Sequence, residues 1–526
     1  MGMHVASQCY ALLLKTSRAI EEDLEPSCKS ETVVELFQCM SRFDDPQFLD
    51  AVMTMRYSDH KELIKKSVNV SGESIDRNLN DLLDYDSLIS SLRLEALYFA
   101  KRLIKVCGSL LLIQFEEDLD FWFELLLPQV FVFREVYDSV LCKEVDADTR
   151  KAAREAVKAL LIIIPRDEQL KLQSWQRIKS DIKDSYSDKM VKLVGIAPDW
   201  ASIWCLMLDV LGAELVRKGN NHLINKLLNV EERAFKYDST DVRVQAFICW
   251  RHLIDKLLLS RIEVPSETVQ RSVRLLVQPL QPNNAKTDIM SCEKLNTWWH
   301  LVQRLEHCIE NHLKTVLVPF FLYCFGSAKT KEIPPGKKYP CLHIPCAKAL
   351  ANILTNDPAA EQETFDRQMS DESVEECIIH PCKVALLNKP AVFLDVSEEL
   401  LYSVGECVII LCGRSEVETC SQLMHSIWNS LLRHVAAVLE NDEILAERVV
   451  KLMQDLLRLV QNLAEHSSST APALATHCIS PLLEGLVMGP YALPPAVLAA
   501  PTYYVGTAQL MTGTPALLLL EVMVSR

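Results

Sequence analysis

Apolar residues recur every three or four positions through most of this chain, and this spacing constrains the fold more than any other feature. One face of the helix predicted over residues 242–258 collects Phe247, Trp250, Ile254, Leu257 and Leu258. A second apolar stripe, over residues 295–317, consists of Leu295, Trp298, Trp299, Val302, Ile309, Leu313, Val316 and Leu317. Both stripes predict helices with one buried side, and Trp250 and Trp298 are predicted core residues.

Glycine is scarce, with 14 residues in a chain of 526. Turn-rich β folds and phosphate-binding loops depend on glycine, because it adopts positive φ angles without strain. A chain of this length also exceeds what a single compact core can organise, so several domains or a repeat array are expected. The sequence therefore predicts an all-α protein.

Two helical segments share a small signature that indicates repeats. "AREAVKAL" (residues 153–160) and "VRVQAF" (residues 242–247) each combine an arginine with a nearby alanine, and Asp148 and Asp241 precede them. This resembles the second helix of a HEAT repeat, in which alanine lets paired helices approach and Asp and Arg connect neighbouring repeats. No strict period is visible, so the prediction is an irregular HEAT/armadillo-like helical repeat superhelix.

Composition divides the chain into three regions. Residues 1–85 are a helical region without a clear assignment, residues 86–465 form the array, and residues 466–526 continue it. Residues 327–340 (rich in proline and lysine) and 356–376 (strongly acidic) are predicted loops, and residues 465–473, "EHSSSTAPA", a linker. The final apolar stretch has no polar outer face, so the array is expected to continue beyond Arg526.

The charge distribution bears on nucleic-acid binding. The net charge of −15 repels DNA on average, so any DNA contact needs a local basic surface. Residues 243–314 contain ten Lys or Arg against seven Asp or Glu, and residues 171–192 contain six against three. A solvated helix face is the simpler interpretation; if DNA binds, we expect contact with the backbone, without base specificity. The candidate contacts are Arg243, Arg251, Lys256, Arg261, Arg271, Arg274, Lys294, Arg304, Lys179 and Lys183.

Several classes of function find no support in the sequence. Nucleotide-binding loops and a serine-hydrolase elbow are absent, so we expect no enzyme and no cofactor. No apolar run is long enough to cross a bilayer, and the scattered 18 cysteines indicate reduced thiols. Thiolates and imidazoles suit zinc, but the spacing of the best cluster matches no known module, so no metal site is predicted. That cluster consists of Cys341, His343, Cys346, Cys377, His380 and Cys382.

Four short segments carry a resemblance to a known family. In order, they are "EERAFK" (231–236), "QAFICWRHLID" (245–255), "RLLVQPL" (274–280) and "TWWHLV" (297–302). Together they resemble the N-terminal HEAT-like domain of the telomere-associated Rap-interacting factor family, best over residues 175–326. The resemblance implies a nuclear scaffold on chromosomes and telomeres, which binds telomeric DNA and protein partners. It also implies roles in telomere maintenance, replication timing, the cell cycle and the choice of double-strand-break repair route.

An alternative of another class remains open. HEAT arrays with an acidic net charge also serve as transport receptors or phosphatase scaffolds, which bind protein cargo without DNA. The family recruits type 1 protein phosphatase through short motifs, but "RVQAF" has Ala246 where such a motif needs an aromatic residue. No phosphatase docking motif is therefore predicted in this chain, no membrane partner is expected, and a homo-oligomer stays possible.

Overall fold

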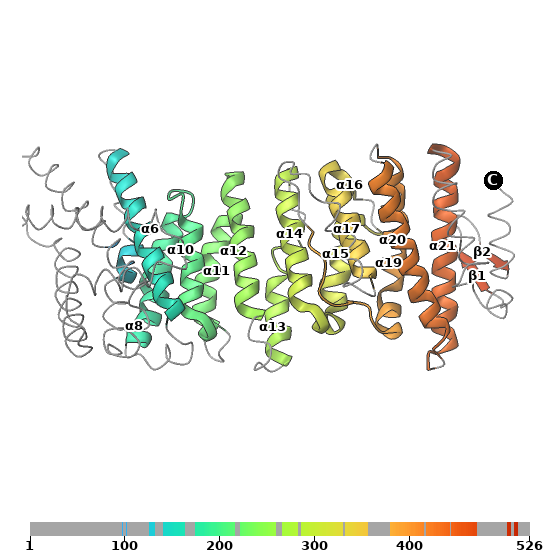
Figure 1. Ribbon diagram of the computed structural model, residues 1–526, viewed down its shortest axis with the longest axis horizontal. Helices are drawn as coiled ribbons and strands as arrows, with labels where there is room; N and C mark the ends of the chain where they lie inside the picture. Colours follow the sequence, from blue (N-terminus) through green and yellow to red (C-terminus); the bar gives the residue numbers. More distant parts are fainter. Residues whose placement is uncertain are drawn as a thin grey trace, which may run out of the picture. The chain divides into compact units, whose positions relative to one another are not determined.

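The computed structural model confirms the all-α, helical repeat-like fold (Figure 1). It describes residues 97, 101, 126–131, 140–163, 174–215, 221–258, 266–281, 286–329, 332–355, 379–414, 417–441, 443–470, 502–505 and 510–513. Within these ranges, one antiparallel pair of short strands accompanies the helices. None of the described helices is both long and apolar enough to cross a membrane. The predicted region 1–85 and the predicted loop 356–376 lie outside the described residues.

The chain divides into two compact units, residues 1–242 and 243–526, and the boundary falls within helix α12 (Thr240–Leu258). The first unit contains α-helices and shorter helical turns, several of which follow one another directly along the chain. These are α6 (Val140–Ile163), α8 (Ser174–Asp181), the π-helical turn η1 (Ile182–Tyr186), α9 (Ser187–Leu193), α10 (Trp200–Leu211), the 3-10 turn η2 (Gly212–Leu215) and α11 (Asn221–Phe235).

Helix α10 is strongly apolar and packs against α6 and α9. Its Trp204 is fully buried, and the indole N–H donates to the Leu227 carbonyl in α11 at 3.2 Å. Behind α9 the chain turns at Gly195, where φ is +78° and an added Cβ would lie 2.1 Å from Cζ of Tyr237. Only glycine fits this turn, because both the backbone angle and the tyrosine ring exclude a side chain.

A buried ion-pair cluster joins α6 to α10. Arg150 donates to the Asp199 carboxylate at 3.0 Å, and Arg154 binds the other carboxylate oxygen. Burial by itself would raise the pKa of Asp199, but the hydrogen bonds and charges of both arginines outweigh it and lower that pKa. Arg154 belongs to the "AREAVKAL" signature, so this arginine does connect two helices, with Asp199 as its partner.

The second unit continues with α-helices and shorter 3-10 and π-helical segments. They are α13 (Ser266–Leu276), α14 (Asp288–Leu305), the 3-10 segment η3 (Glu306–His312), the π-helical turn η4 (Leu313–Leu317), α15 (Val318–Phe325), α16 (Pro335–Lys338), the 3-10 turn η5 (Pro340–Leu342), α17 (His343–Leu354), α19 (Pro390–Cys412), α20 (Val417–Leu439) and α21 (Ala446–Thr470). Strands β1 (Thr502–Val505) and β2 (Leu510–Gly513) pair with Thr502 opposite Gly513.

Helix α19 organises the packing of this unit, because it contacts α15, α17, α20 and α21 (Figure 1). Its Gly405 faces α21, where an added Cβ would lie 2.8 Å from Cδ1 of Leu459. The missing side chain lets the two helices approach closely, as a stacked helical array requires. At the surface, the carboxylate of Glu398 in α19 forms ion pairs with Lys329 at 3.1 Å and with Lys451 of α21 at 3.2 Å.

The predicted core residues are buried. All five residues of the 242–258 stripe and all eight of the 295–317 stripe have exposed fractions below a tenth. Trp250 and Trp298 are in the core as predicted, and Trp299 of the same stripe is buried too. Its indole N–H donates to the His380 carbonyl at 2.9 Å, which accounts for its polar atom.

The structure departs from the sequence-based expectation in the continuity of residues 295–317. The helix α14 ends at Leu305, because Glu306 adopts φ +42°, and 3-10 and π-helical segments follow. The apolar period continues through the break, so spacing alone could not reveal it. Each segment still turns the same apolar residues inward.

Two predicted connections and the predicted continuation of the array also differ. The predicted linker 465–473 is helical as far as Thr470, since serine and threonine are tolerated in a final turn and the chain reaches Pro472 only after it. The predicted loop 327–340 contains the short helix α16, which starts at a proline, a residue that suits a first helical turn. Strands β1 and β2 lie in residues 466–526, for which further helices were expected.

Candidate nucleic-acid interface

Helices α12, α13 and α14 carry seven of the ten predicted DNA contacts. Arg243, Arg251 and Lys256 lie on α12, Arg271 and Arg274 on α13, and Lys294 and Arg304 on α14. The local sequence sets where α14 begins, because the Thr287 hydroxyl accepts from the Met290 amide at 3.3 Å as an N-cap. Arg261 lies outside the described residues.

Arg251 links α12 to α14. Its guanidinium donates to the Glu293 carboxylate at 2.7 Å and to the Thr297 hydroxyl at 3.2 Å. Both charged side chains are about three-quarters shielded from solvent. A cation held in this way is partly neutralised by its carboxylate, so it has less charge to offer a phosphate.

A second contact between the same helices centres on Asp255. Its carboxylate lies 2.6 Å from Nε of Arg304 and 2.8 Å from Nε2 of His300. Burial would raise the pKa of Asp255, but the hydrogen bonds and charges of His300 and Arg304 outweigh it and lower that pKa. Arg304 remains 46% exposed, so its outer edge can still meet a ligand while it holds α14 to α12.

Arg271 and Arg274 are exposed, as is Arg304, among the predicted contacts that the structure describes in the second unit. Both side chains are exposed on α13, and residues three apart lie on the same side of a helix. Arg243 and Lys256 on α12 are half-buried. The pair on α13 therefore presents two exposed guanidinium groups on one side of a helix, where a phosphate backbone could meet both.

Lys294 is not a surface residue, which corrects the prediction that it contacts DNA. Its side chain is completely buried on α14, and its ammonium lies 5.5 Å from the centre of the Tyr323 ring. Burial lowers the pKa of Lys294 to about 7. A phosphate cannot reach this group in the folded structure, so we remove it from the candidate interface.

In the first unit, the predicted contacts Lys179 and Lys183 lie on α8 and η1. Both side chains are half-buried, and Lys183 lies 3.8 Å from the neighbouring Asp184. Arg177 and Lys189 of the same region are exposed. The basic residues of this segment are therefore accessible in part and interspersed with carboxylates.

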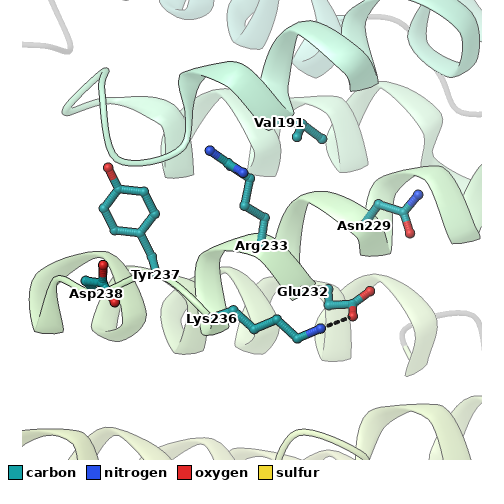
Figure 2. A pocket seen from close by; sticks show the side chains of 7 residues that line it. All are labelled: Val191, Asn229, Glu232, Arg233, Lys236, Tyr237 and Asp238. Atoms are coloured by element: carbon teal, nitrogen blue, oxygen red, sulfur yellow. Dashed lines mark hydrogen bonds and ion pairs between the residues drawn. The ribbon is translucent and has the colours of Figure 1, made fainter.

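A hollow of about 420 Å³ lies near the end of α11 (Figure 2). Its lining includes two basic residues, Arg233 and Lys236, that are not among the predicted DNA contacts. The hollow is lined by Val191, Asn229, Glu232, Arg233, Lys236, Tyr237 and Asp238. Lys236 pairs with Glu232, whereas Arg233 is exposed and extends toward the side of α9 (Figure 2). Arg233 and Lys236 both belong to "EERAFK" (231–236), one of the segments that carry the family resemblance.

Comparison with known proteins identifies the region that carries these helices. Residues 119–315 match the family model described as Rap1-interacting factor 1 N terminal. The chain contains a Rif1 N-terminal domain. All ten predicted contacts and the hollow at α11 fall within the matched residues, so the candidate interface belongs to the Rif1 N-terminal domain.

Curated relatives agree with this domain assignment. The chain is 25% identical over 351 residues to the chicken telomere-associated protein RIF1, and 25% identical over 356 residues to the mouse protein of that name. The fruit-fly RIF1 is 26% identical over 254 residues. The alignments cover 61%, 61% and 46% of this chain, but only 14%, 14% and 16% of those relatives. The chain thus spans a small part of their length.

The cysteines and histidines considered for zinc lie beyond the matched Rif1 N-terminal domain. Cys346 and Cys382 are buried, and burial raises the pKa of the Cys382 thiol to about 12. Cys377 lies outside the described residues. Across the part of the chain that the structure describes, no three His, Cys, Asp or Glu residues gather as metal ligands. Cys341 instead lies beside Cys292, with 3.7 Å between the two sulfur atoms.

Proposed function

We propose that this chain is a nuclear scaffold that associates with telomeres and chromosomes and acts by binding, without turnover. The support is the Rif1 N-terminal domain together with the relatives, each of which is named a telomere-associated protein. Roles in telomere maintenance, replication timing and repair choice extend this proposal, on the strength of the family resemblance.

Within this proposal, the domain contacts the DNA backbone itself. The observation that carries it is the exposure of Arg271 and Arg274, which lie three residues apart on α13. Arginine binds phosphate through a planar fork of donors, which suits it to the backbone of a nucleic acid. Such contacts position a protein on DNA but carry no base information, so the binding is expected to be non-specific in sequence.

The test is a titration of the full chain with double-stranded and 3′-tailed DNA at several salt concentrations. Replacement of both arginines, Arg271→Glu with Arg274→Glu, should weaken binding at low salt by at least tenfold, because two attractions become repulsions. The matched control is Lys383→Glu with Arg433→Glu, which changes the charge equally at two exposed cations outside the predicted segment. The control should bind like the wild-type protein.

A different outcome would select the other class of function. If the wild-type protein binds both DNAs weakly even at low salt, or if both double variants bind alike, direct contact through α13 is rejected. The domain would then be a scaffold for protein partners, and chromosome association would depend on those partners. Recruitment of type 1 protein phosphatase would be one such role, although the sequence predicts no docking motif for it.

A further inference from the structure

Two cysteines that are far apart in sequence meet at the surface of the second unit. Cys292 lies in the first turns of α14 and Cys341 lies in η5, 49 residues later. Their sulfur atoms are 3.7 Å apart, which is van der Waals contact for two thiols. A disulfide needs about 2.05 Å, so a movement of less than 2 Å would join them.

The two thiols differ in accessibility. Cys341 is exposed, whereas Cys292 is half-buried beneath it. Burial, followed by the neighbouring Cys341 and nearby carboxylates, raises the pKa of the Cys292 thiol to about 12. Cys292 therefore stays protonated at neutral pH, and Cys341 is the sulfur that a dissolved oxidant reaches first.

We propose that Cys292 and Cys341 form a reversible disulfide between α14 and η5 when the chain meets a peroxide. The Cys341 thiol gives up its proton, its sulfur attacks a peroxide oxygen and the O–O bond breaks. A sulfenic acid forms, and the departing hydroxide takes up the released proton as one water. The Cys292 sulfur then attacks the sulfenic sulfur, the S–O bond breaks, and its proton leaves with the hydroxide as a second water. Two thiols lose two electrons in total, the peroxide gains them, and a dithiol reductant reverses the reaction.

A second pair of cysteines lies in contact but is shielded from solvent, so it separates the effect of proximity from that of exposure. The thiol of Cys346 is hydrogen-bonded to Cys324, but both side chains are completely shielded from solvent. Burial holds the pKa of Cys346 far above its usual range. An oxidant in solution cannot reach this pair in the folded protein, so it serves as an internal control.

The experiment treats the folded full-length chain with hydrogen peroxide, blocks the remaining thiols by alkylation and maps the tryptic peptides by mass spectrometry. Cys292 lies in peptide 287–294, and Cys341 and Cys346 lie in peptide 339–348, so fragment ions assign the linked sulfur. We expect a Cys292–Cys341 link that disappears on reduction. The oxidised protein should also unfold at a higher temperature than the reduced one, because the link shortens the unfolded chain.

Single variants decide whether the link depends on this pair. Cys341→Ser and Cys292→Ser should each abolish it, whereas Cys308→Ser, at another half-buried cysteine, should leave it intact. Thermal melts of the reduced variants establish that they fold. The proposal is overturned if Cys341 stays reduced, or if it is converted to sulfinic or sulfonic acid without the link. It is also overturned if Cys324 and Cys346 become linked equally well. None of these outcomes bears on DNA binding.

Discussion

Lys294 places an amine on the buried side of α14. The side chain is completely buried on α14, between the buried Ser291 and Thr297 on the same helix, and it lies near the Tyr323 ring. Desolvation disfavours the charged form of a buried amine, which lowers the pKa of Lys294 from 10.5 to about 7. The fold therefore favours release of a proton that the unfolded chain holds until much higher pH.

This difference makes the free energy of unfolding depend on pH. Between about pH 7 and pH 10.5 the unfolded chain binds more protons at this site, so the wild-type protein gains stability as pH rises through that range. Below pH 7 the lysine is protonated in both states, and the full cost of burying the charge remains. Lys294→Met has no such group, and its stability relative to wild type should fall by several kcal/mol across the range.

Urea denaturation of both proteins at pH 7, 8, 9 and 10, followed by circular dichroism, measures this difference. Lys383→Met, at an exposed lysine of the same unit, should show a difference from wild type that is constant with pH. A constant difference for Lys294→Met as well would show that the amine titrates normally in the folded protein.

The buried carboxylate of Asp199 is stabilised by its ion pairs with two arginines. Arg150, Arg154 and Asp199 are largely buried, so removal of the one carboxylate leaves two poorly solvated cations together. Asp199→Asn should lower the free energy of unfolding by about 3 kcal/mol at pH 7. Since the folded pKa of Asp199 is lowered, its contribution is complete above the unfolded pKa near 3.8 and is lost as pH falls through the folded value.

The comparison is Asp188→Asn, which removes the ion pair between Asp188 and Lys226. That carboxylate is 63% exposed, and exposed pairs contribute at most about 1 kcal/mol. Equal effects of the two substitutions in urea denaturation at pH 7 would contradict the importance of burial at Asp199.

The sequence predicted the composition of the candidate interface better than the roles of its residues. It placed cations on α12–α14, but the partners of Arg251 and Arg304 lie more than 40 residues away in sequence, and helical spacing does not reveal them. The burial of Lys294, in contrast, could have been predicted from the sequence. It precedes Trp298 by four residues and so falls on the predicted apolar face, which the charge count ignored.

The break after α14 sets the direction of the next element. Glu306 has φ +42°, a conformation that strains any residue with a Cβ atom by about 1–3 kcal/mol. Glu306→Gly removes that strain, and we expect the free energy of unfolding to rise by about 1 kcal/mol after the entropic cost of glycine. Thermal and urea unfolding at pH 7 measure the change.

The control for this substitution is Gln422→Gly. Gln422 is exposed within α20 and has ordinary helical geometry, so glycine should cost about 1 kcal/mol there. Equal losses at both positions would mean that Glu306 is not strained.

Elements were predictable where local patterning decides them. The apolar stripes of α12 and α14 and the cap at Thr287 all follow from nearby residues. The break at Glu306 and the contact of Gly405 with Leu459 depend on packing between distant segments. Glutamate is not typical of turns, so the local sequence did not predict that the α-helix ends there. The strands β1 and β2 were missed for the same kind of reason, since their pairing is not encoded in the apolar period.

Two electrostatic effects compete over the whole molecule. The net charge of −15 repels DNA at long range, and added salt screens that repulsion and strengthens binding. Direct contacts of arginine with phosphates release counterions from DNA, and added salt weakens that binding. The sign of the salt dependence therefore separates a local cationic surface from an acidic protein that meets DNA only incidentally.

We predict that binding of the full chain to double-stranded DNA weakens as salt rises, because local contacts outweigh the screened repulsion. Each phosphate contact contributes about 0.9 to the slope of log K against log salt. Arg271→Gln with Arg274→Gln should therefore reduce the slope by roughly 2 if each arginine holds one phosphate. Lys383→Gln with Arg433→Gln changes the net charge equally and should leave the slope unchanged. Equal slopes for the two double variants would place any phosphate contacts on other helices, and binding that strengthens with salt would rule out a cationic interface in this chain.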